Sequence, residues 1–187
     1  MLKVLVPLAE GFEEIEAVSM VDIMRRGGLE VIVVALDDDM EVLGANGITV
    51  KAERSIVGLG ADDIDMIALP GGWDGTYALA DDVNVQALLK AMDAKGKDIG
   101  AICAAPFALK KAGVLKETYT CYPSVEDEIK QEGYQGDKSQ VIQTENVMTS
   151  RGPGTAICFG LAIVKRLMGE ENYNAVREGT LSLHCDK

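Results

Sequence analysis

The residue with the clearest chemical meaning in this sequence is Cys103, which separates a short apolar run from a segment with helical character. The run Ile99–Ile102 ends at the cysteine, and Ala104–Lys111 continues as the expected helix. A strand that enters a helix without a loop makes a tight turn, which exposes the residue at its apex. The positive end of the following helix favours a thiolate there. The pattern predicts a nucleophilic Cys103 with a depressed pKa, and a buried core cysteine is the alternative.

The carboxyl group of Glu16 is a second candidate, within a helix expected at Glu13–Arg26. The neighbours of Glu16 on the helix surface are the apolar residues Phe12, Met20 and Ile23. A carboxyl group in such a stripe loses solvation, which raises its pKa. In its protonated form it would donate a hydrogen bond to a nearby thiolate. The alternative is an ion pair with an arginine, which a partner chain could supply.

Two glycine-containing segments have the composition of anion sites. Gly71 and Gly72 follow an apolar run and Pro70, and their amides can approach a bound group closely because no side chain intervenes. An ordinary turn is the alternative. The segment Ser150–Thr155 (SRGPGT) precedes another expected helix. An anion could bind at that helix N-terminus, but the composition favours a plain cap.

The remaining cysteines and the one histidine give weaker signals. With Cys103, the residues Cys121, Cys158 and Cys185 show no CxxC spacing, so we expect no metal site and mostly reduced thiols. Cys121 ends an expected strand, where a packing role is favoured over that of a second redox thiol. His184 lies close to the last residue, and we expect it at the surface rather than beside Cys103.

Composition limits the class of protein. The 187 residues fit one domain, residues 1–187, and a hydrophobic content of 48% with 26% charged residues is typical of globular chains. A net charge of −12 argues against nucleic acid or an anionic membrane as partner. The apolar N-terminal run is short for a signal peptide, and no run approaches the ~18 apolar residues of a membrane span. We therefore expect a cytoplasmic protein.

Apolar runs alternate with helical segments along the chain, which is typical of an α/β fold with a mainly parallel sheet and helices on both faces. Ligands of such sheets bind beyond the carboxyl ends of the strands. We therefore expect the segments after Leu8, Leu69 and Ile102 to meet at one edge. The expected strands are Val4–Leu8, Glu30–Leu36, Ile48–Ala52, Asp65–Leu69, Ile99–Ile102, Thr118–Tyr122 and Val141–Met148; the other expected helices are Val83–Ala94, Thr155–Met168 and a short one near Asn172–Arg177.

The expected helix Glu13–Arg26 is apolar around most of its circumference. A helix packed on a sheet normally keeps one polar face in water. Two apolar faces predict a second cover, because soluble monomers rarely expose a large apolar patch. We expect a homodimer built on this helix, with Met20 and Met24 in the interface.

Five motifs together resemble the ThiJ/PfpI superfamily, and most closely its DJ-1-like branch. In chain order they are Glu10–Val18 (EGFEEIEAV), Met24–Gly28 (MRRGG), Leu69–Gly72 (LPGG), Ala101–Pro106 (AICAAP) and Thr149–Thr155 (TSRGPGT). The resemblance covers essentially the whole chain. It implies a flavodoxin-like three-layer sandwich that forms a homodimer through the first helix.

The resemblance also implies a site. Cys103 would be the elbow nucleophile, Glu16 its protonated partner, and the amides of Gly72 and Ala104 an oxyanion site. The activities reported for the family are cofactor-free glyoxalase action on 2-oxoaldehydes and deglycase action on methylglyoxal adducts. The expected substrate is thus a small aldehyde or a glycated group, with no cofactor. The alternative is an oxidative-stress sensor or protective chaperone whose cysteine oxidises to a sulfinate.

Auxiliary residues follow from the same resemblance. Arg26 and the loop with Arg151 and Pro153 would lie near the active site of a partner subunit. Ala104 stands where protease members have a histidine, which disfavours a peptidase. Tyr122 stands where the DJ-1-like branch often has a histidine, and a phenol with a pKa of about 10 is a poor proton shuttle at neutral pH. We expect turnover to be slow or to rely on Glu16 alone.

Overall fold

The computed structural model describes residues 1–186, and a seven-stranded sheet forms its centre. The strand order is β5-β2-β1-β6-β7-β9-β8, and every neighbouring pair is parallel except β9 with β8 at one edge. The mainly parallel sheet expected from the sequence is confirmed. Its strands are β1 (Lys3–Leu8), β2 (Glu30–Ala35), β5 (Arg54–Ser55), β6 (Met66–Leu69), β7 (Asp98–Ile102), β8 (Val141–Thr144) and β9 (Val147–Ser150).

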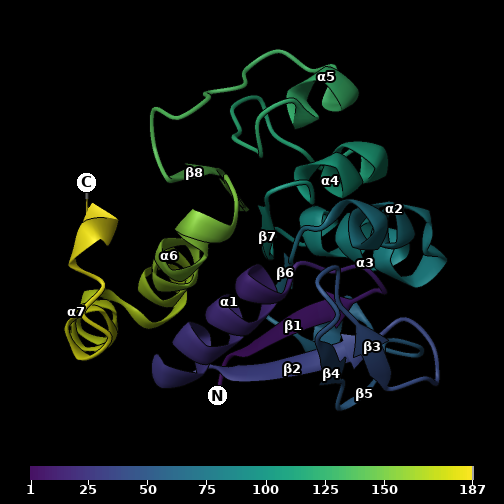
Figure 1. Cartoon of the computed structure of the whole chain (residues 1–187), viewed down its shortest axis with the longest axis horizontal. Helices are drawn as coiled ribbons and strands as arrows, with labels where there is room; N and C mark the ends of the chain where they lie inside the picture. The colour runs from purple at the N-terminus through teal and green to yellow at the C-terminus, as the bar shows by residue number, and fades with distance from the viewer. Residues whose placement is uncertain (187) are drawn as a thin grey trace.

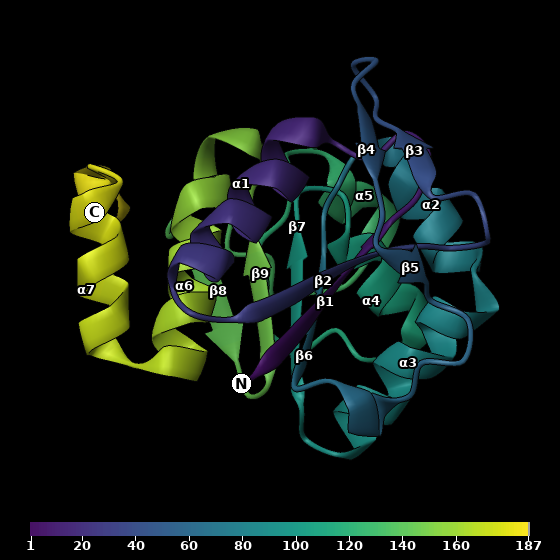
Figure 2. The same cartoon turned by 90° about the horizontal axis from the view of Figure 1, so that it is seen from below.

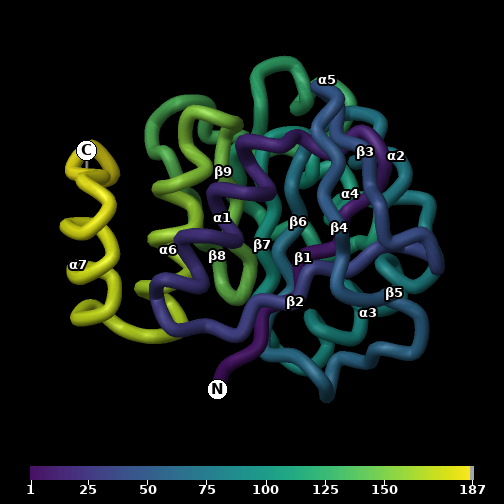
Figure 3. The backbone as a smooth tube through the Cα atoms, turned by 60° about the horizontal axis from the view of Figure 1, so that its bottom comes forward, coloured from purple at the N-terminus to yellow at the C-terminus, as the bar shows by residue number. Residues whose placement is uncertain are grey.

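Helices cover both faces of the sheet, which gives the three layers expected from the sequence (Figures 1 and 2). On one face lie α1 and α6, with α7 on the outer side of α6 (Figure 3). The other face carries α2, α3 and α4. The helices are α1 (Glu14–Arg26), α2 (Trp73–Asp81), α3 (Val83–Ala94), α4 (Pro106–Ala112), α5 (Val125–Ile129), α6 (Ala156–Met168) and α7 (Glu170–Gly179), with short 3-10 turns at Ala61–Asp63, Pro153–Thr155 and Leu183–Asp186.

The helix α6 packs closely against α1 and covers much of the apolar surface of α1. A Cβ atom placed on Gly160 would lie 3.0 Å from Cβ of Ile23, so the glycine allows the two helices to approach closely. Met20 and Met24 are fully buried in this contact region. The expectation that these two methionines form a dimer interface is therefore wrong, because α6 of the same chain covers them.

A small β-hairpin stands apart from the main sheet. The strand expected at Ile48–Ala52 is β4 (Thr49–Lys51), and it pairs in antiparallel fashion with β3 (Glu41–Leu43) instead of joining the sheet. Backbone hydrogen bonds connect the hairpin to the segment between β1 and α1, including one of 2.8 Å from Gly11 N to the carbonyl of Leu43. The hairpin thus lies over the start of α1 and not at the sheet edge.

The sequence reading also missed a turn near the C-terminal third of the chain. The strand expected at Val141–Met148 is the hairpin β8–β9, which reverses at Glu145 and Asn146; Glu145 has a φ of 55°. The strand expected at Thr118–Tyr122 is an isolated bridge between Tyr119 and Tyr134. The missed reversal has a simple cause, since an apolar run does not reveal where it turns.

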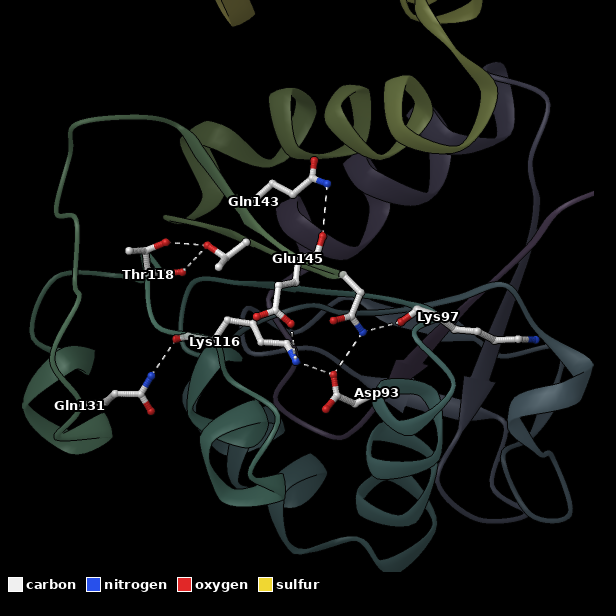
Figure 4. A network of polar contacts seen from close by, with 9 residues as sticks. Asp93, Lys97, Lys116, Thr118, Gln131, Gln143 and Glu145 are labelled. Carbon is white, nitrogen blue, oxygen red and sulfur yellow. Dashed lines mark hydrogen bonds and ion pairs between the residues drawn. The ribbon is translucent and has the colours of Figure 1, made fainter.

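A polar network holds the β8–β9 turn against α3 (Figure 4). The amide of Asn146 donates to Asp93 Oδ1 over 3.2 Å and to the carbonyl of Lys97 over 2.8 Å. The ammonium of Lys116 lies 2.7 Å from Asp93 and 3.3 Å from Glu145. The side chains of Lys116 and Asp93 are largely buried. The network therefore holds the β8–β9 hairpin, the antiparallel edge of the described sheet, against α3.

The C-terminal segment is tied back to the fold, against expectation. Cys158 of α6 and Cys185 form a disulfide with their Cα atoms 5.0 Å apart. The expectation that these two cysteines are reduced thiols is therefore wrong in this structure, whereas Cys103 and Cys121 are free. Among residues 1–186, none of the helices has the length and apolar character needed to cross a bilayer.

Candidate active site

The carboxyl ends of β1, β6 and β7 bring three loops to one edge of the sheet, as the sequence predicted. Register pairs Leu5 with Ile67 and Leu69 with Ala101, so the three strands end at similar heights. The chain leaves β1 towards β2 on one side and returns as β6 on the other, which makes a switch point between β1 and β6. Ligands of open parallel sheets bind at such points.

Cys103 occupies a sharp turn between β7 and α4. Its φ is 65°, in the left-handed region that favours glycine, and this places it at the apex of an elbow. The backbone is held from both sides, because Cys103 N donates to the carbonyl of Ser150 over 3.0 Å and Tyr122 N donates to the carbonyl of Cys103 over 2.9 Å. The predicted strand–cysteine–helix elbow is present, although the side chain is mostly buried, with 9% exposed.

The two glycines after β6 lie against this cysteine. A Cβ atom on Gly71 would come within 2.6 Å of Cβ of Cys103 and 2.7 Å of Oε2 of Glu16, so no side chain fits there. Gly72 has a φ of 88°, which turns its amide towards the Cys103 sulfur. The amides of Gly72 and Ala104 both hydrogen bond to that sulfur. Two backbone amides are thus directed at the sulfur from either side of the elbow, and an oxyanion site at this place remains a prediction.

Glu16 is fully buried on the first turn of α1 and faces Cys103. Glu13 caps the helix by accepting a hydrogen bond of 2.8 Å from Glu16 N, which fixes the direction of this turn. Oε2 of Glu16 accepts a 2.7 Å hydrogen bond from Gly71 N. Oε1 is buried and has no nitrogen or oxygen partner in the described part of the chain, which leaves the Cys103 thiol as its neighbour. An arginine partner for Glu16, the alternative reading, is absent from residues 1–186.

The electrostatics of the pair differ in part from the sequence expectation. Burial raises the pKa of Glu16 to about 7, while hydrogen bonds from Cys103 and Gly71 work in the opposite direction. Burial and the adjacent Glu16 carboxylate also raise the pKa of Cys103, against the smaller lowering by the Gly72 and Ala104 amides. A depressed thiol pKa is thus not what the structure shows. The two acidic groups compete for a single negative charge.

Two expected auxiliary residues, Tyr122 and Arg151, belong to segments whose backbone contacts the elbow: Tyr122 bonds to Cys103 directly, and Arg151 follows Ser150, which also bonds to Cys103. The backbone N–H of Tyr122 donates the hydrogen bond to the carbonyl of Cys103. The Tyr122 ring packs against Gly152, since a Cβ atom added to Gly152 would lie 3.1 Å from the ring, and 47% of Tyr122 is exposed. Arg151 lies close enough to Tyr134 to work against the rise in the pKa of this phenol, and Pro153 begins the 3-10 turn ahead of α6. Cys121 is buried, and burial raises its pKa to about 12, as expected of a thiol in a packing role.

Other predicted candidates lie away from the elbow. Arg26 stands at the far end of α1 from Glu16, about 15 Å along the helix axis, and pairs with Asp22 at 3.2 Å. His184 is exposed, as expected, and its Nε2 lies 3.7 Å from Sγ of Cys185. Neither residue contributes to the pocket of Cys103 in the described chain.

Glu14 is a second buried acid on the first turn of α1. Its carboxylate accepts hydrogen bonds from Asn46 N (2.6 Å), Asn46 Nδ2 (2.9 Å) and Ile48 N (3.3 Å). Burial alone would raise the pKa of Glu14, but these bonds lower it overall. Glu14 therefore anchors the β3–β4 hairpin to the helix that carries Glu16. The pattern of polar and apolar residues along a helix cannot reveal that a carboxylate accepts hydrogen bonds from a loop far away in the sequence, here the loop with Asn46.

Comparisons with known proteins agree with this architecture. Residues 2–166 match the model of the DJ-1/PfpI family. The chain is 36% identical over 178 residues to "Protein dj-1beta" of Drosophila melanogaster, covering 95% of each chain. It is 33% identical over 184 residues to "Glutathione-independent glyoxalase DJ-1" of Schizosaccharomyces pombe, covering 94% of this chain and 96% of the relative. The crystal structure of Drosophila melanogaster DJ-1beta superposes with a TM-score of 0.92, covering 96% of this chain and 97% of that one.

Proposed function

Because the chain belongs to the DJ-1/PfpI family, we propose that it acts on reactive 2-oxoaldehydes or their adducts, as a glyoxalase or deglycase, through Cys103 and Glu16. At family level this proposal is supported by the Schizosaccharomyces pombe relative, which is named a glutathione-independent glyoxalase. The observation that carries it is local. A cysteine at an elbow receives two amide hydrogen bonds and faces a buried carboxyl group whose pKa is raised to about 7.

The proposed reaction converts methylglyoxal and water into lactate. The Cys103 thiolate attacks the aldehyde carbon, and the carbonyl electron pair moves onto an oxygen that the Gly72 and Ala104 amides stabilise. Protonated Glu16 gives its proton to this oxygen. The Glu16 carboxylate then removes the proton from the former aldehyde carbon, and the electron pair moves onto the neighbouring ketone oxygen to give an enediolate. Glu16 returns this proton to the adjacent carbon, while the hydroxyl proton of the former aldehyde oxygen passes to the former ketone oxygen, which leaves a thioester of lactate. Water hydrolyses the thioester, which releases lactate and restores the thiolate.

Turnover of methylglyoxal tests the proposal. The wild-type chain should produce lactate, Cys103→Ser should fall to the uncatalysed background, and Glu16→Gln should lose about 10²- to 10⁴-fold because it cannot transfer the proton. Cys121→Ser is the matched control, since Cys121 is a free, buried thiol outside the elbow, and it should keep wild-type turnover. Circular dichroism verifies that each variant is folded. Full activity in folded Cys103→Ser would exclude the proposal.

A second candidate function is oxidative-stress sensing, with Cys103 oxidised to a sulfinate. The observation in its favour is that the Gly72 and Ala104 amides and Glu16 contact the sulfur, because these amides and the protonated Glu16 carboxyl group can donate hydrogen bonds to sulfinate oxygens. Peptide mass mapping after mild peroxide treatment tests it. Two added oxygen atoms on Cys103, with unmodified Cys121 and no methylglyoxal turnover, would favour sensing over catalysis.

The proposed assembly is a homodimer through the exposed side of α1. Ile15 and Val18 are more than half exposed on this helix, although the methionines are covered by α6. A surface groove of about 610 Å³ runs beside them between α1, β2 and β4, and Val18, Val21 and Val50 line it. A second chain that covers this groove would bury the remaining apolar side of α1. In such a dimer, Arg26 and the Arg151–Pro153 loop are the residues proposed to approach the partner's site.

A further inference from the structure

The C-terminal turn brings together three soft metal ligands that lie far apart in the sequence. Sγ of Cys158, Sγ of Cys185 and a ring nitrogen of His184 all lie within 4.8 Å of one another. Cys158 comes from the buried side of α6, and the other two come from the turn Leu183–Asp186. None of these three residues belongs to the Cys103 elbow, and neither candidate function uses them.

We propose that Cys158, Cys185 and His184 form a redox-gated zinc site, which is open to Zn²⁺ when the two cysteines are reduced and closed when they form the disulfide. Thiolate and imidazole are the ligands that Zn²⁺ prefers in proteins. From the sequence we expected no metal site, because the cysteines show no CxxC spacing. That argument fails here because the fold brings Cys158 close to Cys185 and His184.

The geometry of the cluster suits a tetrahedral ion. With Zn–S near 2.3 Å and Zn–N near 2.0 Å, neighbouring ligands of a tetrahedron lie about 3.5–3.8 Å apart. The distance from Cys185 Sγ to His184 Nε2 is already 3.7 Å. Rotation of the two cysteine side chains after reduction suffices to separate the sulfurs, because the Cα atoms are 5.0 Å apart and Cys185 lies on a short surface turn.

An adjacent cavity provides the fourth coordination position. A surface cavity of about 340 Å³ is lined by Cys158 and Cys185 together with Gln140 and Ser139, and also by Lys165, whose positive charge is balanced by Glu170 at 2.9 Å. Oε1 of Gln140 is buried and has no hydrogen-bond partner among the described residues, which is an independent sign of an unfilled polar site. A water molecule on the zinc ion would donate a hydrogen bond to this oxygen. Three protein ligands and one water is the arrangement of an open zinc site.

Charge and chemical balance are consistent with the proposal. The net charge of −12 raises the local concentration of divalent cations around the chain. A dithiol reductant transfers two electrons and two protons to the Cys158–Cys185 bond and itself becomes a disulfide, which leaves two thiols on the protein. Binding of Zn²⁺ then forms two Zn–S bonds and releases these two protons to solvent, so the affinity must increase with pH.

Cobalt(II) substitution tests the site with a direct spectroscopic readout. The starting chain is the double variant Cys103→Ser/Cys121→Ser, in which every thiolate signal must come from Cys158 and Cys185. After anaerobic reduction and removal of the dithiol, one Co²⁺ per chain should give sulfur-to-cobalt charge-transfer absorption, which Zn²⁺ then displaces. The same chain oxidised with diamide should bind at least about 100-fold more weakly, because two of its three ligands are lost.

Three further variants assign the ligands. Cys185→Ser, which lies on a surface turn, should weaken cobalt binding and remove part of the charge-transfer absorption. Cys158→Ser should do the same from the buried side. His184→Ala should weaken binding about 10- to 100-fold and keep the thiolate absorption. Equal affinity in the oxidised chain, or unchanged absorption in Cys185→Ser, would overturn the proposal.

Discussion

Two buried acids, Glu16 and Cys103, share a pocket in which only one negative charge is easily accommodated. Burial raises the pKa of both groups, and each anion opposes formation of the other. Because the pair loses its first proton well before its second, the thiolate forms mainly while Glu16 keeps its own proton. The fraction of thiolate is then set by the competition between the two groups and not by the thiol alone.

The pH dependence of Cys103 alkylation should report this competition. In the wild-type chain, the rate of reaction with iodoacetamide should rise with a midpoint near pH 7, where the pair first ionises, reach a plateau, and rise again only at high pH. In Glu16→Gln the step near pH 7 should disappear and the thiol should titrate in one transition. Mass mapping separates Cys103 from Cys121. An identical profile in both chains would show that Glu16 does not control the thiol.

At the scale of the elements, the β3–β4 hairpin depends on one carboxylate of α1. Glu14 accepts three hydrogen bonds from Asn46 and Ile48, and a Cβ on Gly44 would collide with its side chain. The hairpin in turn bonds to Gly11 and Phe12 in the loop that leads to the site. Glu14 thus connects a peripheral element to the first turn of α1.

Replacing Glu14 by Gln should destabilise the chain at neutral pH. Hydrogen bonds to a charged group contribute about 1.5–3 kcal/mol, so a loss of about 1–3 kcal/mol is expected. The folded pKa of Glu14 is lowered, so its contribution is present above the unfolded value of 4.5 and is lost as pH falls through the folded pKa. Urea unfolding at a series of pH values should show the difference from wild type shrinking in acid.

The matched control for this prediction is Glu41→Gln. Glu41 is an exposed acid on β3 of the same hairpin. Its replacement should leave the free energy of unfolding within about 0.5 kcal/mol of wild type, as is usual for surface positions. Equal effects of the two substitutions would mean that the bonds to Glu14 contribute nothing specific.

Local signals in the sequence were sufficient for the central elements and for the elbow, but not for contacts between distant segments. The apolar runs at β1, β6 and β7, and the small residues around Cys103, are local features, and the structure has them where they were expected. The reversal at Glu145 was missed because an apolar run does not reveal where it turns, and the disulfide of Cys158 was missed because only the tertiary fold brings Cys185 close to it. The raised pKa of Glu16 was foreseen from its apolar neighbours, whereas that of Cys103 follows from Glu16 itself.

At the scale of the whole molecule, the side of α1 that faces away from α6 still exposes apolar side chains. Val18 is the informative position, because it is 52% exposed on α1 and lines the adjacent groove. A charge there is harmless to a single chain but unfavourable in an apolar interface, where an unpaired charge costs several kcal/mol by order of magnitude.

Sedimentation should therefore separate Val18→Glu from a matched surface variant. The wild-type chain should sediment as two copies, and Val18→Glu as one. The control is Val83→Glu, at the start of α3 on the other face, where the valine is 76% exposed; it should remain dimeric. A wild-type chain with the mass of one copy would contradict the proposed dimer, and a fully active single-chain Val18→Glu would contradict the shared-site role of Arg26.

The order of strands in the sheet also determines when during folding the elbow can form. Val4 pairs with Met66, and Ile99 pairs with Val147, so the strands on which Glu16, Gly72 and Cys103 depend meet only over long stretches of chain. Contacts between distant residues form slowly. During synthesis Cys103 emerges well before Ser150, which holds its backbone in the turn.

The thiol of a growing or refolding chain should consequently behave as an ordinary cysteine until β9 joins β7. In a refolding time course, brief pulses of iodoacetamide should label Cys103 at the rate of the unfolded chain, and the native rate should appear together with the final change in the fluorescence of Trp73. Native reactivity that precedes that change would mean that the elbow forms without its sheet. The nascent protein thus carries an unprotected thiol, and oxidants can reach it before the pocket exists.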